Sequence, residues 1–163
     1  MSDIIKLEEL EDFKMYSPIL VLNEDIYFDN RFCVLNTNMG NIAFSYYELG
    51  IAPSVVIENK ILFLSFGVSC YVINLVGNKL LYQSNGLASI VFEIVKCSTK
   101  SCVVFVGELS LLCFSIEGLL MWKNSYRNII FDWRVTDEGI FVELENGEKM
   151  LVSFENGNGV SIT

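Results

Sequence analysis

The chain contains no histidine, and this absence removes whole classes of chemistry. Histidine is the commonest general base and the commonest metal-binding side chain. Without it, the chain cannot build a Ser-His or Cys-His nucleophile or a zinc site that needs imidazole. Basic residues are scarce as well, because 11 lysines and arginines stand against 20 acidic residues, for a net charge of −9. A surface of this charge repels phosphate backbones, so nucleic-acid binding is disfavoured.

The cysteines lack the spacing of a metal or redox motif. None of the five, at positions 33, 70, 97, 102 and 113, belongs to a Cys-x-x-Cys pair, and most lie in apolar runs. Such cysteines are typical of buried free thiols in a reducing cytosol. The N-terminal segment also lacks the basic start and apolar core of a signal peptide. We therefore expect a cytoplasmic protein that carries no metal and no cofactor.

Apolar residues make up 52% of the 163 residues, enough for one domain with a sizeable core. The runs 61–78 and 101–122 carry few charges and approach the length of a membrane-spanning helix. Both runs are interrupted by glycine and are rich in β-branched and aromatic residues, which favours strands. We expect no membrane span.

Short apolar runs separated by turn residues continue from residue 19 to the C-terminus. The clearest stretch is NKILFLSFGVSCYVINLVGNKLLYQS, residues 59–84, which is followed by a similar one, KSCVVFVGELSLLCFSIEGLLMWKNS, residues 100–125. Each copy has two apolar runs, a glycine turn and a short strand that ends in an aromatic residue. The glycine turns recur about every 40 residues, close to the length of a propeller blade. The pattern predicts about four β units of roughly 40 residues between residues 19 and 163, mainly antiparallel.

The first residues have a different pattern. Within residues 2–15, apolar Ile4, Leu7, Leu10 and Phe13 recur every three positions, with acidic residues between them. This spacing predicts a short amphipathic helix that docks on the sheets.

Four Asn-Gly pairs predict turns, at Asn85-Gly86, Asn146-Gly147, Asn156-Gly157 and Asn158-Gly159. The second pair fits a type I′ hairpin turn, because both residues tolerate positive φ. The run 25–30 contains Ile, Tyr and Phe and predicts a further strand.

The two copies at 59–84 and 100–125 resemble the blade repeat of PQQ-like and WD40-like β-propellers. In that repeat a strand, a glycine corner, a second strand, a glycine turn and an aromatic-ended strand follow one another. The resemblance covers residues 19–163 and implies an all-β domain of repeated β-meander units, arranged as a propeller, a half-propeller or a sandwich. The Trp-Asp dipeptide of WD40 repeats is absent, and nothing matches a quinone site, so no cofactor is carried over.

Carboxylates are the remaining candidate functional groups. Glu143 and Glu145 alternate with Val142 and Leu144, as expected for the solvent side of a strand. Opposed carboxylates can hydrolyse glycosides, but this alternation is more typical of a solvated strand face, so we predict no catalytic residue and no enzyme. We predict a partner-binding surface formed by six acidic residues: Asp132, Asp137, Glu138, Glu143, Glu145 and Glu148.

Two functions fit this profile. An acidic, compact, β-rich cytoplasmic chain resembles the bacterial immunity proteins of contact-dependent growth inhibition, which implies a cognate toxin as partner. An acidic surface suits a basic toxin such as a nuclease, whose active site it would occlude. The alternative is a propeller-like scaffold or a subunit of a larger complex, in which the apolar excess covers a partner or a second copy of the chain.

Overall fold

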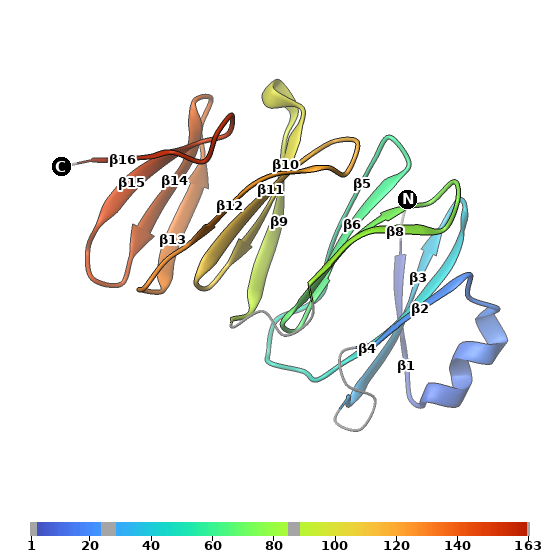
Figure 1. Cartoon of the computed structure of the whole chain (residues 1–163). Coiled ribbons are helices and arrows are strands. Elements are labelled where there is room, and N and C mark those ends of the chain that lie inside the picture. Colours follow the sequence, from blue (N-terminus) through green and yellow to red (C-terminus); the bar gives the residue numbers. More distant parts are fainter. Residues whose placement is uncertain (1–2, 24–28, 85–88, 163) are drawn as a thin grey trace.

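The structure is a computed structural model that describes residues 3–23, 29–84 and 89–162. Its strands form four four-stranded sheets that stand side by side in one row (Figure 1). We name them sheets A to D in chain order, and sheets A and D lie at opposite ends of the row. The predicted all-β, mainly antiparallel and propeller-like architecture is confirmed.

The two inner sheets are meanders, in which each strand pairs antiparallel with the strand before it. Sheet B consists of β5 (Ser54–Glu58), β6 (Ile61–Phe66), β7 (Ser69–Asn74) and β8 (Lys79–Ser84). Sheet C consists of β9 (Val91–Cys97), β10 (Cys102–Gly107), β11 (Ser110–Ser115) and β12 (Leu120–Ser125), with a 3-10 turn, η2 (Ser98–Lys100), after its first strand.

The two end sheets differ from each other. Sheet D is a meander of β13 (Ile130–Val135), β14 (Gly139–Leu144), β15 (Lys149–Ser153) and β16 (Gly159–Ser161). Sheet A has the order β1-β3-β4-β2, and its edge strand β2 runs parallel to β4. Its strands are β1 (Asp3–Leu7), β2 (Leu20–Asn23), β3 (Arg31–Thr37) and β4 (Gly40–Tyr46). A 3-10 helix, η1 (Leu10–Tyr16), lies beside sheet A at that end of the row (Figure 1).

The repeated stretches 59–84 and 100–125 fold alike, as β6-β7-β8 and β10-β11-β12. Gly77 lies in the turn before β8, and Gly118 lies in the turn before β12. The pairing of β8 and of β12 with the preceding strand shifts register at equivalent places, one residue before Tyr82 and one before Trp122. The sequence repeat is therefore a repeat of three-stranded meanders.

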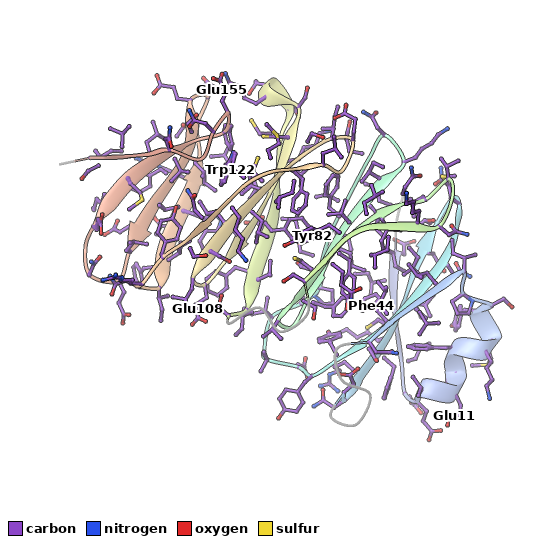
Figure 2. The ribbon with its side chains drawn as sticks, in the orientation of Figure 1. Glu11, Phe44, Tyr82, Glu108, Trp122 and Glu155 are labelled. Atoms are coloured by element: carbon purple, nitrogen blue, oxygen red, sulfur yellow. The ribbon has the colours of Figure 1, made fainter. Side chains whose placement is uncertain are left out.

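The aromatic side chain that follows each register shift contacts the next sheet in the row. Tyr82 meets Phe114 of sheet C edge to face, with ring centroids 5.0 Å apart. The indole N–H of Trp122 donates to the backbone carbonyl of Phe154, just after β15 in sheet D, over 2.8 Å. Figure 2 shows Phe44, Tyr82 and Trp122 between successive sheets. These contacts join neighbouring sheets into one continuous core.

The core has three apolar layers between neighbouring sheets and a smaller cluster between sheet A and η1, where Phe13 packs on Val34 and Ala43. Every residue of β6 and of β10 is buried, because both faces of these central strands are covered. Strands of this kind have nearly continuous apolar sequences, which explains ILFLSF and CVVFVG. The same property gave the two runs their resemblance to membrane spans. Within the described residues, no helix is both long and apolar enough to cross a bilayer.

The predicted helix over residues 2–15 needs correction. Its first half is strand β1, in which Ile4 and Ile5 pair with Leu35 and Val34 of β3. β-Branched residues suit a strand, and this pairing satisfies an edge of sheet A that would otherwise be open. Helical geometry is confined to Leu10–Tyr16, and the first of the four sheets begins at Asp3 rather than near residue 19.

The hairpin turn at Asn146-Gly147 is also different from the prediction. Gly147 has a φ of +84°, but Asn146 does not have a positive φ. Hydrogen bonds from Gly147 N–H to the Leu144 carbonyl (2.8 Å) and from Leu144 N–H to the Glu148 carbonyl (2.9 Å) close a three-residue loop. Such loops end in a left-handed residue, which here is the glycine. The predicted strand at 25–30 lies mostly, and the turn at Asn85-Gly86 wholly, outside the described residues.

Candidate functional surface

Sheet D has one covered face and one open face. Along β14, Ile140, Val142 and Leu144 point toward sheet C and are buried in the layer between the two sheets. Successive strand residues point to opposite sides, so Phe141 and Glu143 point away from sheet C. Among the described residues, no sheet packs against that side (Figure 1). We call it the outer face of sheet D and define it by these residues: Asp132, Arg134, Phe141, Glu143, Lys149, Leu151 and Val160.

Strand register arranges the outer face in two parallel rows. The mixed apolar row crosses the four strands in the order Arg134, Phe141, Leu151, Val160. The charged row crosses β13, β14 and β15 in the order Asp132, Glu143, Lys149. Two residues separate the rows along each strand, which is a spacing of about 7 Å.

The mixed apolar row has a cation at one end and an exposed aliphatic side chain at the other. The guanidinium carbon of Arg134 lies 4.5 Å from the centroid of the Phe141 ring. This cation–π contact covers the ring, so Phe141 is only 8% exposed although it lies on the open side. Leu151 is half-buried, and Val160 is 67% exposed. Within this row, Leu151 and Val160 therefore offer apolar surface that no part of the described chain covers.

The charged row is close to neutral. Nζ of Lys149 lies 3.1 Å from a carboxylate oxygen of Glu143, and both side chains are partly exposed. Asp132 is exposed on the next strand, directly across from Glu143. Together with Arg134, the outer face carries two positive and two negative side chains.

The outer face is also hollowed. A depression of about 340 Å³ lies at the end where β13 turns into β14, and Arg134, Phe141, Leu151 and Ile162 form part of its wall with the turn residues Thr136, Asp137 and Glu138. A smaller depression of about 240 Å³ lies at the other end of the strands, beside Phe131, which is 73% exposed. Exposed apolar surface in a hollow rimmed by charge is typical of protein-binding sites.

The six acidic residues predicted as a binding surface all belong to sheet D, but they do not form one patch. Asp132 and Glu143 lie on the outer face. Asp137 and Glu138 lie in the β13–β14 turn, whereas Glu145 and Glu148 lie in the β14–β15 turn at the opposite end. The six residues of β14 span about 20 Å between these turns. The alternation of Glu143 and Glu145 with buried Val142 and Leu144 is as predicted.

Sequence reasoning missed the basic and apolar members of the outer face: Arg134, Phe141, Lys149, Leu151 and Val160. A signal was present at Phe141. It stands between Ile140 and Val142, so β14 is apolar on both sides there, like β6 and β10. A strand with that pattern needs cover on both faces, and the structure covers β14 on one.

A cleft of about 470 Å³ opens between sheets C and D, and it shares the turn residues Thr136 and Asp137 with the larger depression of the outer face. Lys96, Cys97, Thr99, Val135 and Asp137 contribute to its lining. Just inside it, Cys97 pairs across the strands with Cys102, and Cys113 lies in the same apolar layer.

All five cysteines are free and buried, as predicted. Hydrogen bonding with Cys113 lowers the pKa of the Cys102 thiol, while that bond and burial raise the pKa of Cys113. Among the residues that the structure describes, no group of three or more histidines, cysteines or acids is arranged to hold a metal ion. The three thiols at this cleft thus belong to the apolar layer between sheets C and D.

Comparison with known proteins identifies the fold and no family. No protein-family model matches the sequence, and no curated protein matches it significantly. Among solved structures, the computationally designed protein Ika4 aligns with a TM-score of 0.50 and 13% identity, over 69% of this chain and 72% of Ika4. The designed protein Ika8 aligns with a TM-score of 0.50 and 12% identity, over 79% of this chain and 45% of Ika8. Hsv2 from Kluyveromyces lactis aligns over 69% of this chain and 38% of its own length, with a TM-score of 0.40 and 16% identity.

These neighbours are propeller folds, and the row of four sheets matches their architecture. The chain spans less than half the length of Ika8 and of Hsv2. At such low identity the likeness concerns the fold alone. None of the comparisons supports the hypothesis of a toxin-immunity protein.

Proposed function

We propose that the chain is a non-enzymatic, propeller-like scaffold of the cytoplasm that binds a protein partner on the outer face of sheet D. One observation carries the proposal: sheets A, B and C each pack an apolar face against the next sheet, whereas sheet D turns the corresponding face to solvent. Leu151 and Val160 lie on that face beside a hollow of about 340 Å³, and they are half-buried and exposed, respectively. Uncovered apolar surface of this kind favours association with another protein.

The surrounding charge supports a protein partner over a nucleic acid. The chain carries a net charge of −9, which opposes contact with a phosphate backbone. The proposal involves no cofactor, because binding through an apolar face with a charged rim needs none.

Inhibition of a basic toxin remains a second hypothesis, with weaker support than the scaffold. An inhibitor that replaces nucleic-acid phosphates needs its carboxylates close together. On sheet D, Glu145 and Glu148 lie about 20 Å from Asp137 and Glu138, and Glu143 is paired with Lys149. A basic toxin domain would therefore meet several separated acidic sites instead of a single acidic surface.

The test compares variants of the outer face with a matched variant elsewhere. Wild-type protein and a Leu151→Glu/Val160→Glu variant are used to capture partners from the native host, and the captured protein is then purified and its affinity measured with each variant. We expect binding to weaken at least tenfold, since a buried carboxylate without a partner costs more than about 1.4 kcal/mol. Val76→Glu is the control, because Val76 is 63% exposed in the β7–β8 turn of sheet B, and sheet C lies between sheets B and D. A partner that binds both variants equally well would contradict the proposal.

A further inference from the structure

We propose that Cys97 and Cys102 form a site of reversible oxidation, at which hydrogen peroxide that enters the cleft between sheets C and D converts the two thiols into a disulfide. The inference does not use the outer face of sheet D, so it stands independently of the proposed function. It rests on the position of three cysteines, 97, 102 and 113, in the apolar layer between the two sheets. Figure 2 shows sulfur atoms in this layer near the labelled Trp122.

Strand register selects the two cysteines that can be joined. Cys97 ends β9 and lies directly opposite Cys102, the first residue of β10. Opposed residues of antiparallel strands have Cα atoms about 4.5–5.5 Å apart, which is within the range of about 4.4–6.8 Å that a disulfide spans. Both side chains lie in the layer that faces sheet D. The two thiols can therefore join without rearrangement of the strands.

Cys113 is close to this pair but is less well placed for a disulfide. It lies opposite Val104 of β10, so it is the diagonal neighbour of Cys102, at an expected Cα separation of about 7–8 Å. A disulfide does not bridge more than about 7 Å without backbone movement. Cys97 lies two strands away from Cys113, about 10 Å across the sheet. Cys113 thus acts as a hydrogen-bonding partner of the site.

Access and acidity give the two thiols different parts in the reaction. Cys97 is 4% exposed and lines the cleft of about 470 Å³ beside Ser98 and Thr99, so a molecule as small as hydrogen peroxide meets this thiol first. Its Sγ lies 3.4 Å from the hydroxyl oxygen of Thr99. Hydrogen bonding with Cys113, and to a smaller extent with Cys97, lowers the pKa of the Cys102 thiol. Because the thiolate is the nucleophile, Cys102 is suited to attack an oxidised Cys97.

The oxidation balances in two steps. The Cys97 thiolate attacks one oxygen of hydrogen peroxide, the O–O bond breaks, and the released hydroxide takes up the proton lost by Cys97, which leaves a sulfenic acid and one water. The Cys102 thiolate then attacks the Cys97 sulfur, the S–O bond breaks, and the leaving hydroxide takes up the Cys102 proton as a second water. The two thiols lose two electrons, which reduce one peroxide to two waters. A small-molecule thiol reverses the reaction by exchange.

The disulfide closes the turn η2, whose residues lie between the two cysteines. This turn contributes Ser98 and Thr99 to the lining of the cleft. Its last residue, Lys100, forms an ion pair with Glu155, just after β15 in sheet D, over 3.3 Å. A covalent bond at the base of the turn limits the motion of these residues, so oxidation fixes the mouth of the cleft.

The other two cysteines provide internal controls. Cys33 lies in the layer between sheets A and B, and Cys70 lies in the layer between sheets B and C. Among the described residues, neither layer contains a second cysteine. Burial raises the pKa of both thiols, so little thiolate forms near neutral pH. Oxidation at the proposed site should therefore precede oxidation of these two control cysteines.

The test maps disulfides in the folded wild type after treatment with hydrogen peroxide near neutral pH. Free thiols are blocked with N-ethylmaleimide, and the protein is unfolded and digested with trypsin without reduction. Trypsin separates Cys97, in the peptide CSTK, from Cys102 and Cys113, which share residues 101–123. The expected product joins the two peptides, with a mass lower by two hydrogen atoms. It should form at least about tenfold faster than the control cysteines lose their free thiols.

Three variants assign the pairing. In Cys113→Ser the joined peptides should persist, because serine can still donate a hydrogen bond to Cys102. In Cys102→Ser they should be lost, and Cys97 should instead be trapped as a sulfenic acid by dimedone. Cys97→Ser should remove both products. Fragmentation of the joined wild-type peptides identifies the bridged cysteine directly, which decides the pairing even if a variant does not fold.

Three outcomes would overturn the inference. Joined peptides that persist in Cys102→Ser would show that Cys97 pairs with Cys113. A disulfide within residues 101–123 of the wild type would show that Cys102 pairs with Cys113 instead. Absence of any disulfide, or oxidation of the control cysteines at the same rate, would show that the cleft gives peroxide no preferred access. None of these results depends on whether the outer face of sheet D binds a partner.

Discussion

The two end sheets of the row each have one side that no neighbouring sheet covers. A helix covers this side on sheet A, whereas no described element covers it on sheet D. On sheet A the side is covered by helix η1, which places Phe13 over Val34 and Ala43 and sets its ring edge to face with Phe32, 6.2 Å between centroids. On sheet D the side carries the ion pair of Glu143 with Lys149 and lies open.

A row of sheets therefore need not expose both of its ends. Small residues on the outward side of β3 and β4 leave room for a large ring from η1, so the chain completes its own core at sheet A. At sheet D, charged residues replace every second apolar residue on the outward side of the strands. The outward side of sheet D therefore stays hydrated at its charged positions and leaves Leu151 and Val160 partly exposed. One end of the row is completed by the chain itself, and the other end is not covered by any described residue.

The largest expected effect comes from uncovering sheet A. Phe13 is 6% exposed, and its replacement by alanine removes most of the apolar contact between η1 and the sheet. We expect Phe13→Ala to lower the free energy of unfolding by about 3–5 kcal/mol, measured by urea denaturation. Met15→Ala, in the same helix and 72% exposed, should change it by less than about 0.5 kcal/mol. Equal effects of the two substitutions would mean that η1 does not act as a cover.

This contrast also explains how much the sequence predicts. The repeat of strands and turns was predictable, because glycine turns at Gly77 and Gly118 and the apolar runs between them are local signals. Strand β1 was not, since Ile4 and Ile5 acquire their strand geometry from pairing with β3, about 30 residues later in the chain. The spacing of Leu10 and Phe13 did predict a helical segment correctly in its second half.

The binding surface was predictable only in part for a similar reason. Alternation along β14 gives the exposed side of Glu143 directly from the sequence. The place of Lys149 opposite Glu143 depends on the loop at Gly147, whose three-residue form sets the register of β15. With a two-residue turn, as predicted, the register of the pair would differ. The grouping of charged and apolar residues on the outer face therefore required the structure.

An effect of intermediate size is a loss of stability at alkaline pH, which comes from a thiol buried between two sheets. Cys70 lies in the layer between sheets B and C, and burial raises the pKa of its thiol from 9.0 to about 12. The unfolded chain ionises this thiol near pH 9, whereas the folded chain keeps it neutral. The stability that Cys70 contributes is therefore complete below pH 9 and is lost as the pH rises toward 12, by about 1.4 kcal/mol per pH unit.

Urea denaturation of the wild type and of Cys70→Ala between pH 7 and pH 10.5 measures this loss. The difference in unfolding free energy between the two proteins should be constant up to pH 8.5. By pH 10.5 it should shift by about 2 kcal/mol in favour of the variant. A difference that is independent of pH would show that the thiol is accessible to water and that the layer between the sheets is not closed at this point.

The smallest expected effect is the loss of stability from a substitution on the outer face of sheet D. The same valine-to-threonine change on the buried side of the sheet serves as its control. Val152 of β15 is fully buried toward sheet C, and Val160 of β16 is 67% exposed on the outer face. Val152→Thr buries a hydroxyl in an apolar layer and should lower the free energy of unfolding by about 1–3 kcal/mol. Val160→Thr should change it by less than about 0.5 kcal/mol, because the Val160 side chain already lies in water. Urea denaturation of the two variants and of the wild type measures both changes. Equal losses of stability in the two variants would show that the outer face of sheet D is covered in solution.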